Sequence, residues 1–284
     1  MITFALAAAL LMEPTSTPVT LETEPASLHG TLLRPEGPIM ATAVIIPGSG
    51  PTDRDGNSPM GVRNGALKQL AEGLAAQGIA SVRIDKRGIA QSRAAGPVES
   101  QLSIDAYIED ARNWASLAKE QTGVPCVWMI GHSEGALVVQ SAANKDDTNI
   151  CGQVLLAGAG RPAGVILREQ IKGQIPEEGM ALVENVLSEL EAGRLVENPP
   201  APLQSLFRPS VQPYLISWLP RDPAALARTY QGPIFIGQGT TDLQTTVVDA
   251  QTLHDAQPRA ELKLWEGVNH VLVEVTANPY DNMV

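Results

Sequence analysis

The sequence predicts an α/β fold with a mostly parallel, doubly wound sheet and a helical cap insertion. Short apolar segments alternate with segments whose apolar residues recur at helical spacing. Continuous apolar strands separated by amphipathic helices are typical of a parallel sheet covered on both faces. The stretch 161–232 interrupts this alternation and contains no clear strand. A chain of 284 residues, 44% hydrophobic and 18% charged, is long enough for one large core.

The elements follow in order along the chain. Segment 19–37 partly alternates and contains a turn signal, which predicts an antiparallel hairpin at the sheet edge. Strands are expected at 42–48, 79–85, 126–131, 153–160, 233–239 and 260–267. Helices are expected at 65–78, 103–120, 135–145 and 246–257. The predicted core therefore comprises residues 19–160 and 233–284.

The stretch 161–232 is predicted to be a mostly helical cap on the carboxyl edge of the sheet. A structureless loop of this length is uncommon in a compact domain. Its segment MALVENVLSELEAG has an apolar face at helical spacing. That face consists of Leu182, Val183, Val186, Leu187 and Leu190. A separate interaction domain is the alternative interpretation.

The first eighteen residues differ from the rest in composition. The apolar run MITFALAAALLM is followed by EPTSTPVT, which predicts a secretory signal peptide or a disordered tail for residues 1–18. No Lys or Arg precedes the run, and no clear cleavage site follows it. The run is shorter than the roughly 20 residues of a spanning helix, so we expect no stable membrane insertion. A secreted or periplasmic location is expected, with the cytoplasm as the alternative.

Net charge and cysteine content narrow the range of partners. The formal charge is −11, and no basic run is present, so nucleic acid is not an expected partner. Cys126 and Cys151 each precede a predicted strand. They form a disulfide if the strands are neighbours in an oxidising compartment, and are otherwise two buried thiols. Neither lies in a CxxC motif, and we expect no metal site.

The motif GHSEG, residues 131–135, places a serine between a predicted strand and a predicted helix. This context is that of the G-x-S-x-G nucleophile elbow, in which a strained turn exposes the serine. Gly131 and Gly135 leave room for the tight reversal. We therefore interpret Ser133 as a nucleophile. A serine that only caps a helix is the simpler alternative.

Four features in order resemble the α/β-hydrolase superfamily, and within it a group of bacterial serine esterases. They are GSGPTDRDGN at 48–57, DKRG at 85–88, GHSEG at 131–135 and the strandless segment after the next strand. The resemblance covers about residues 20–275. It implies a Ser–His–Asp triad, an oxyanion hole and hydrolysis of carboxylic esters.

A serine nucleophile needs a base within hydrogen-bond reach. The four histidines are His29, His132, His254 and His270. His29 falls in the predicted hairpin, His132 adjoins the serine, and His254 lies in a predicted helix. His270 follows the last predicted strand, where the superfamily has its base, and it is therefore the expected base.

The acid of the triad is expected, by resemblance, after the preceding strand. Asp242 lies just beyond PIFIGQG and gives the superfamily order of serine, aspartate and histidine. Asp249 and Asp255 fall in the next predicted helix and are expected to be solvated.

The oxyanion hole is expected to use backbone N–H groups. Glu134 follows the nucleophile and supplies one donor. By resemblance, Ser49 supplies the other, with Gly50 next in line. The Gly-rich loop lacks the G-x-x-x-x-G-K-[ST] spacing of a phosphate-binding loop.

Two charged motifs follow neighbouring predicted strands. Asp53, Arg54 and Asp55 lie in one, and Asp85, Lys86 and Arg87 in the other. We expect Asp53, Arg54, Asp55 and Arg87 to support the oxyanion loop through an ion-pair network, which Glu134 can join.

The expected activity is cleavage of small esters with short to medium acyl chains through an acyl-enzyme. Thioesterase and aminopeptidase activity, or a non-catalytic ligand-binding protein, are alternatives. An aminopeptidase needs acidic groups for the substrate ammonium. The cap offers Glu177, Glu178, Glu184, Glu189 and Glu191, but these are expected to be solvated. No cofactor is implied.

The segment after His270 is shorter than in the resembling superfamily, which usually closes with a long helix. Either the chain is truncated, or a second subunit of a homodimer covers this flank of the sheet.

Overall fold

A computed structural model describes residues 13–145, 148–172 and 175–275. The strands are β1 (Thr15–Leu21), β2 (Leu28–Arg34), β3 (Ala41–Ile46), β4 (Ile79–Ile84), β5 (Val127–His132), β6 (Ile150–Leu156), β7 (Ile234–Gly239) and β8 (Glu261–Trp265). The α-helices are α1 (Ala66–Ala76), α2 (Ile104–Thr122), α3 (Glu134–Ala143), α4 (Ala163–Lys172), α5 (Glu177–Glu191), α6 (Gln204–Phe207), α7 (Gln212–Trp218), α8 (Pro223–Thr229) and α9 (Val247–Ala256). Short 3₁₀ turns are η1 (Ala90–Ala95), η2 (Glu99–Gln101) and η3 (Ala201–Leu203).

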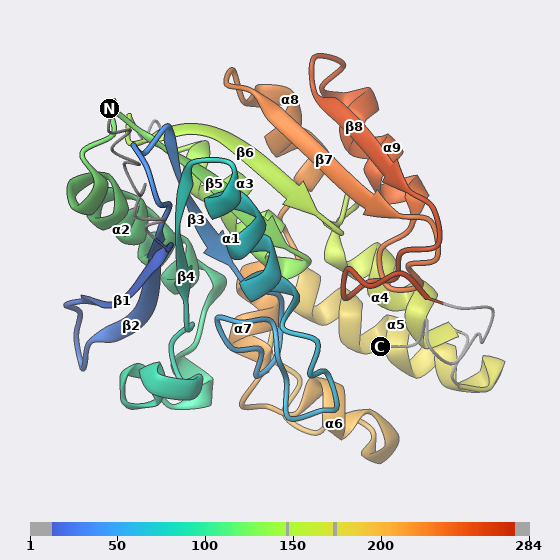
Figure 1. Cartoon of the computed structure of the whole chain (residues 1–284). Coiled ribbons are helices and arrows are strands. Elements are labelled where there is room, and N and C mark those ends of the chain that lie inside the picture. The colour runs from blue at the N-terminus through green and yellow to red at the C-terminus, as the bar shows by residue number, and fades with distance from the viewer. Residues whose placement is uncertain (1–12, 146–147, 173–174, 276–284) are drawn as a thin grey trace, which may run out of the picture.

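The eight strands form one sheet in the order β1-β2-β4-β3-β5-β6-β7-β8 (Figure 1). The pairs from β4 to β8 are parallel, whereas β1–β2 and β2–β4 are antiparallel. The predicted mostly parallel α/β sheet is therefore confirmed. Because these strands are parallel, their carboxyl ends lie at one edge of the sheet, and the strand order changes direction between the neighbours β3 and β5.

The edge hairpin begins earlier than the sequence indicates. β1 starts at Thr15, inside the segment 1–18 that composition assigns to a signal peptide or tail. It pairs only with β2, and Pro18 lies opposite Thr31. An edge strand accepts proline because one side of its backbone has no ladder partner. Residues 1–12, which contain the apolar run, lie outside the described residues.

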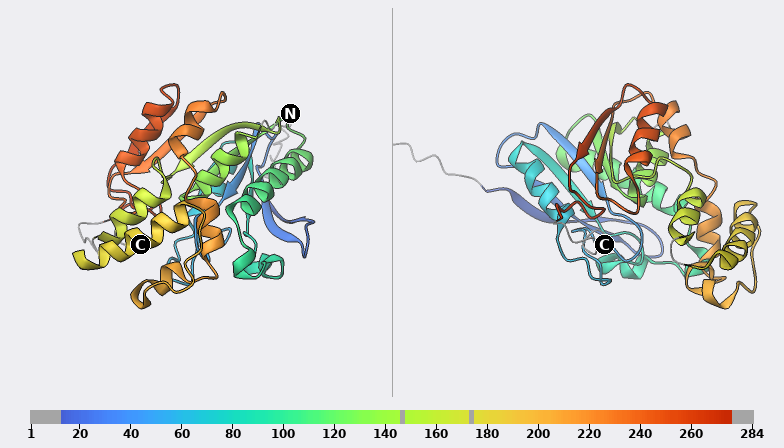
Figure 2. Two further views of the ribbon diagram at one scale, coloured as in Figure 1. Left: turned by 180° about the vertical axis from the view of Figure 1, so that it is seen from behind. Right: turned by 90° about the vertical axis from the view of Figure 1, so that its right-hand side faces the viewer.

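Helices cover both faces of the sheet. α1 packs on one face, where Leu67 and Ala71 contact Ile45 and Ile130 of the sheet in one buried cluster. α2, α3 and α9 pack on the opposite face within the larger core cluster, which includes the fully buried Trp114. Figure 2 shows these two layers from behind and from the side. Both faces of the central strands are consequently apolar, as their continuous hydrophobic sequences require.

The helices α4 to α8 lie between β6 and β7, and α4 to α7 gather beyond the carboxyl ends of the strands (Figures 1 and 2). No strand occurs in the described part of this insertion. Helix α5 buries Val183, Val186, Leu187 and Leu190 as the apolar spacing predicts. Leu182 departs from the prediction, because 45% of its surface is exposed. Leu182 is at the edge of the apolar face of α5 and does not pack into the core.

Cys126 and Cys151 form a disulfide, so the alternative of two buried thiols is wrong. The two residues stand at the amino ends of β5 and β6, which are neighbours in the sheet. Among the described residues, no helix is long and apolar enough to cross a membrane. Residues 276–284, on which the question of a missing last helix depends, are outside the described ranges.

Candidate active site

Ser133 stands on a sharp turn between β5 and α3. Its backbone angles are φ 55° and ψ −121°, a conformation that non-glycine residues rarely adopt. At this turn, backbone atoms of other residues lie very close to both flanking glycines. A Cβ on Gly131 would lie 2.2 Å from the Gly135 carbonyl oxygen, and one on Gly135 would lie 2.4 Å from that of Ile46. The strained serine is therefore held at the carboxyl edge of the sheet, as in a nucleophile elbow.

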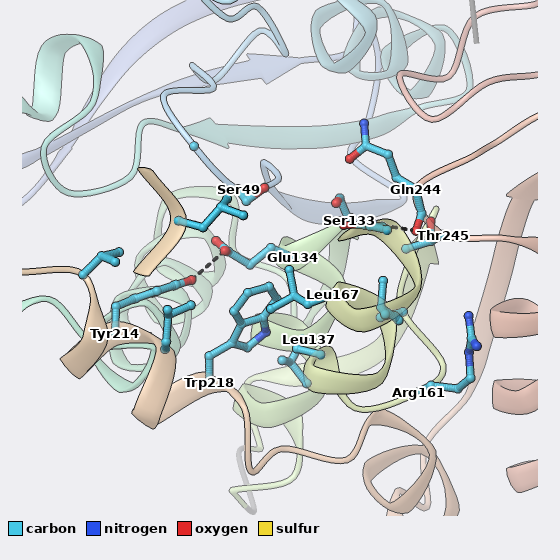
Figure 3. Close-up of a pocket in the computed structure, with 18 of the residues that line it drawn as sticks. Ser49, Ser133, Glu134, Leu137, Arg161, Leu167, Tyr214, Trp218, Gln244 and Thr245 are labelled. Atoms are coloured by element: carbon cyan, nitrogen blue, oxygen red, sulfur yellow. Dashed lines mark hydrogen bonds between the residues drawn. The ribbon is translucent and has the colours of Figure 1, made fainter. Parts of the chain in front are cut away.

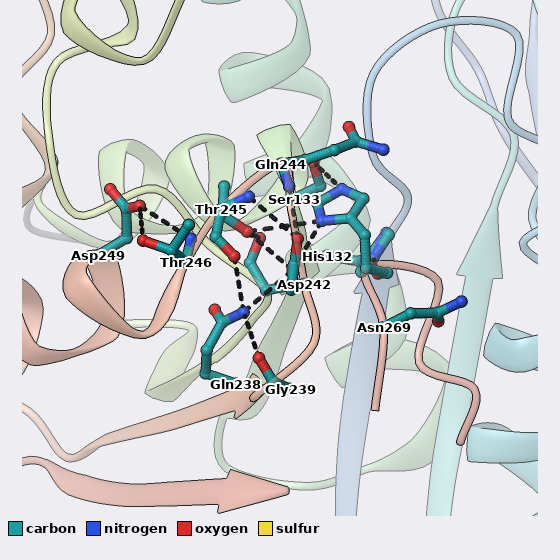
Figure 4. Close-up of polar contacts among 12 residues, drawn as sticks. His132, Ser133, Gln238, Gly239, Asp242, Gln244, Thr245, Thr246, Asp249 and Asn269 are labelled. Atoms are coloured by element: carbon teal, nitrogen blue, oxygen red, sulfur yellow. Dashed lines mark hydrogen bonds and ion pairs between the residues drawn. The ribbon is translucent and has the colours of Figure 1, made fainter. Parts of the chain in front are cut away.

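The structure brings Ser133, His270 and Asp242 together, although they are far apart in sequence. Ser133 Oγ lies 3.0 Å from His270 Nε2, and His270 Nδ1 lies 2.9 Å from Asp242 Oδ2 (Figure 4). A carboxylate accepts hydrogen bonds only, so the proton of a neutral His270 resides on Nδ1. His270 Nε2 is then free to accept the hydrogen bond of the serine hydroxyl. This geometry permits proton transfer from Ser133 to His270.

Asp242 is buried and accepts several hydrogen bonds. Oδ1 accepts the backbone N–H groups of Gln244 and Thr245 at 2.8 and 3.0 Å, and Oδ2 accepts Gln238 Nε2 at 3.0 Å. Burial alone would raise the pKa of Asp242, but the hydrogen bond from His270 and the two backbone N–H groups outweigh it. The pKa therefore lies below its ordinary value. Asp242 stays ionised beside His270.

Thr245 and Gln238 were not identified from the sequence. Thr245 Oγ1 lies 3.1 Å from Asp242 Oδ2 and donates to the Ala157 carbonyl at 2.9 Å. Gln238 comes from the end of β7 and also donates to the Thr245 carbonyl. The segment GQGTTDLQTT, residues 237–246, therefore supplies several of the hydrogen bonds to the Asp242 carboxylate that it contains. The many small polar residues that follow the strand are the sequence feature that could have identified Thr245 and Gln238.

His132 forms a hydrogen bond with the backbone of His270, the expected base. Its Nε2 donates to the His270 carbonyl at 2.7 Å, and part of its ring faces a cavity. Burial, followed by the nearby His270, lowers the pKa of His132 to about 4. The ring is neutral at pH 7 and acts as a donor through Nε2.

Acidification is expected to destabilise the protein through His132. Its unfolded form binds a proton near pH 6.5 and its folded form near 4, so the unfolded state binds more protons between these values. Stability should fall by on the order of 2 kcal/mol as pH drops through this window, allowing for the ring's partial solvent contact. The free energy of unfolding in urea, measured at pH 7 and at pH 4.5, gives this loss of stability. His132→Gln, which keeps a donor but does not titrate, should show a smaller loss, and an equal loss would contradict the assignment.

Ser49, Gly50 and Glu134 lie beside Ser133, and all four line one cavity. Glu134 is the first residue of α3, so its N–H has no acceptor within the helix. Gly50 has a φ of 67°, which favours glycine there. Within the described ranges, the N–H groups of Ser49, Gly50 and Glu134 donate to no backbone acceptor.

The side chain of Glu134 links the elbow to the insertion. Its Oε2 accepts a hydrogen bond from the Tyr214 hydroxyl at 2.6 Å (Figure 3). Its Oε1 lies 3.4 Å from Lys86 Nζ. Burial and the Glu134 carboxylate raise the pKa of Tyr214 well above its ordinary value, so the phenol remains a donor. The sequence allowed Glu134 to join the charged network but did not identify Tyr214, because nothing local pairs α7 with the elbow.

The charged motifs form separate pairs, not one network. Arg54 pairs with Asp85 at 2.5 Å, and its backbone N–H donates to the same carboxylate. Asp55 pairs with Arg83 of β4. Asp53 Oδ1 instead accepts the backbone N–H groups of Asp55 and Asn57, both at 2.9 Å.

Arg87 lies apart from those pairs. It binds both carboxylate oxygens of Asp110 on α2, at 2.6 and 2.7 Å. Arg54 and Asp53 thus brace the loop after β3, whereas Arg87 braces the loop after β4 against a helix.

The prediction of a solvated Asp249 is wrong. Asp249 is fully buried and accepts two hydrogen bonds from Arg161, both at 3.0 Å. It also completes a capping box with Thr246 at the start of α9. Arg161 comes from the start of the insertion, so helical position alone could not show this burial. Asp255 is exposed, as expected.

The glutamates of α5 do not reach Ser133. Glu184 and Glu191 both pair with Arg168, and Glu189 pairs with Arg194. Glu177 and Glu178 are exposed. Among the described residues that line the adjoining cavity, the single carboxylate is that of Glu134.

Two cavities meet at Ser133 and His270. The first, of about 420 Å³, is mainly apolar (Figure 3). Its wall is made by Leu137, Ile166, Leu167, Phe207, Leu215 and Trp218. The second, of about 320 Å³, lies between the loop after β3 and the segment Val271 and Leu272. In the described residues, no cluster of His, Cys, Asp or Glu is arranged to hold a metal ion.

Comparisons with known proteins agree with this architecture. Esterase EstD from Thermotoga maritima is 29% identical over 247 residues, which cover 86% of this chain and 57% of that protein. The chain thus spans little more than half the length of this relative. Est1E from Butyrivibrio proteoclasticus, solved with ferulic acid, superposes with a TM-score of 0.62 at 17% identity, covering 89% and 91% of the two chains. The α/β hydrolase GrgF from Penicillium sp. sh18 gives 0.62 at 19% identity, covering 90% and 91%.

At these identities the two solved structures establish the fold, which is that of the α/β hydrolases. The family profile described as serine aminopeptidase, S33 matches residues 60–265, most of the chain. This match includes the elbow, the insertion and Asp242. The chain therefore belongs to the serine aminopeptidase S33 family of α/β hydrolases.

Proposed function

We propose that the protein is a serine carboxylesterase whose triad is Ser133, His270 and Asp242. The observation that carries this proposal is the continuous relay from Ser133 Oγ through His270 to Asp242, with distances of 3.0 and 2.9 Å. Similarity to a protein named as an esterase supports the reaction class.

The chemistry follows from the relay. Ser133 Oγ attacks the ester carbonyl while His270 Nε2 takes the hydroxyl proton, and Asp242 stabilises the imidazolium. His270 then gives this proton to the leaving alcohol, which yields an acyl-enzyme. Water deprotonated by His270 releases the acid. The backbone N–H groups of Glu134 and Ser49, with Gly50 beside them, stabilise the oxyanion.

We assign neutral esters as substrates because the first cavity is largely apolar. The Glu134 carboxylate is already hydrogen-bonded by Tyr214 and lies beside Lys86, so it does not offer an unpaired charge to a substrate ammonium. The acidic residues of α5 are paired with arginines or exposed away from the site. An ester is therefore favoured over an aminoacyl amide.

The experiment that tests the function compares p-nitrophenyl esters with aminoacyl anilides and thioesters on the wild-type protein. We expect ester hydrolysis and covalent labelling by a fluorophosphonate. Faster turnover of anilides would assign a peptidase instead. Absence of both labelling and turnover would leave a non-catalytic binding protein.

We assign the acyl group to the first cavity and the alcohol to the second. His270 protonates the alcohol, and the residues after it, Val271 and Leu272, line the second cavity. Leu167→Trp should then lower kcat/KM for a p-nitrophenyl hexanoate at least about tenfold by filling the first cavity, and leave the acetate within about threefold. Equal losses for both esters would contradict the assignment.

We also propose that helices α4 to α7, within residues 161–232, act as a cap that sets substrate size, and that Asp53, Arg54, Asp55 and Arg87 brace loops around the site. The Cys126–Cys151 disulfide supports export to an oxidising compartment. Fractionation of the native host with thiol titration tests this, and a reduced cytoplasmic protein would refute export.

A further inference from the structure

Lys86 is a buried cation with two fixed polar contacts. Its Nζ donates to the Gly48 carbonyl oxygen and lies 3.4 Å from Glu134 Oε1. The ammonium also stands 5.3 Å from the centre of the Tyr107 ring. Only 4% of its side chain is exposed. Lys86 follows β4, whereas Gly48 follows β3, so the contact ties together the ends of two adjacent strands.

The Gly48 carbonyl belongs to the same peptide unit as the N–H of Ser49. The described chain has one cis peptide bond, at Glu24–Pro25, so the Gly48–Ser49 unit is trans. In a planar trans peptide the C=O and the N–H point in opposite directions. A cation that fixes the direction of the carbonyl therefore also fixes the direction of the Ser49 N–H.

The Lys86 ammonium also contacts the side chain of Glu134, the residue whose backbone N–H is the second proposed oxyanion donor. Glu134 Oε1 faces Lys86, and Glu134 Oε2 accepts Tyr214 from α7. The carboxylate is therefore held between the ammonium and a phenol. A carboxylate at this place would oppose a developing oxyanion, and the ammonium offsets its charge. Because Lys86 polarises the Gly48 carbonyl, the Ser49 N–H of the same peptide unit is also a stronger donor.

A purely structural role is the competing explanation. Buried ion pairs contribute little net stability, since desolvation offsets their attraction. The contact with the Gly48 carbonyl favours a positioning role, because an ion pair with Glu134 alone would not orient the Ser49 N–H.

We propose that Lys86 is a positioning residue that orients the Ser49 N–H of the oxyanion hole through the Gly48 carbonyl. This proposal rests on the proposed function. Glu134 and Tyr214 hold the ammonium in place, so helix α7 of the insertion is connected to the hole.

Lys86→Met tests the proposal because it keeps an unbranched side chain of similar size and removes the cation. We expect kcat for a p-nitrophenyl ester to fall about 10²-fold, as for loss of one oxyanion donor, with KM within about threefold. Affinity for an aryl trifluoromethyl ketone should fall by a similar factor. In that adduct Ser133 Oγ bonds to the carbonyl carbon, the carbonyl electron pair moves to oxygen, and the serine proton passes to His270.

Lys119→Met is the matched control. Lys119 is half-buried and donates a hydrogen bond to Asn149 Oδ1 at 2.9 Å, near the amino end of the sheet. It should leave kcat and ketone affinity within about twofold of wild type. Lys86→Met with unchanged kcat and ketone affinity, or the same loss in both variants, would overturn the proposal.

A crystal structure of the wild-type ketone adduct decides the question without relying on a variant that folds. We expect the adduct oxygen within hydrogen-bond distance of the Ser49 N–H and Lys86 Nζ on the Gly48 carbonyl. An adduct oxygen away from Ser49, or an ammonium that has left Gly48, would refute the role of Lys86. Wild-type ester turnover tests the proposed function separately.

Discussion

Replacing Ser133 with alanine is expected to lower kcat/KM for a p-nitrophenyl ester by at least about 10⁴-fold. The substitution removes the Oγ that lies 3.0 Å from His270 Nε2 and leaves no other hydroxyl in that position. What remains is catalysis by the oxyanion donors and by binding. Stopped and steady-state hydrolysis assays measure the loss, and fluorophosphonate labelling should disappear with it.

Ser141→Ala is the matched control, in helix α3 that follows Ser133. Its hydroxyl is buried and has no hydrogen-bond partner among the described residues, so its removal should change kcat/KM less than twofold. Both variants should unfold within about 0.5 kcal/mol of wild type, since Ser133→Ala keeps the strained backbone. If Ser133→Ala retained activity within tenfold of wild type, the serine mechanism would be wrong.

Gly131→Ala is expected to destabilise the fold by about 3 kcal/mol or more. The new Cβ would lie 2.2 Å from the Gly135 carbonyl oxygen and 2.5 Å from the Ala136 nitrogen, both backbone atoms of α3. Backbone cannot swing aside as a flexible side chain can, so strand and helix must separate. Urea unfolding gives the free energy, and loss of ester turnover should accompany it because the elbow moves.

Gly73→Ala provides the contrast. Gly73 lies inside α1, and a Cβ there would meet nothing within 4 Å. Alanine should stabilise the helix by about 0.5–1 kcal/mol. If the two alanine variants had similar stabilities, close packing at the elbow would not be the reason for Gly131.

The parts of the fold that are encoded locally could be predicted from the sequence. Each parallel strand is a short apolar run, and the elbow is complete within GHSEG, so strand, turn and helix follow from neighbouring residues. Asp242 and His270 were assigned from the resemblance to the α/β hydrolases, which have the acid and the base after the last two strands, and the structure brings both residues to Ser133. Their placement in the chain carries the information.

What could not be predicted depends on contacts between distant segments. Tyr214 reaches Glu134 from a helix eighty residues later. Asp249 is buried because Arg161 from the insertion covers it. The disulfide required knowledge that β5 and β6 are adjacent, and β1 was obscured by its proline at an edge. In each case the surroundings of a residue depend on a segment that is distant in sequence, which the neighbouring residues do not reveal.

The two cavities at Ser133 are built from different stretches of chain. One is walled mainly by the insertion, and the other by the loop after β3 and the residues after His270. Mutations in one stretch consequently need not disturb the other. Preference for each half of a substrate can drift independently during evolution, and directed evolution can alter one half at a time.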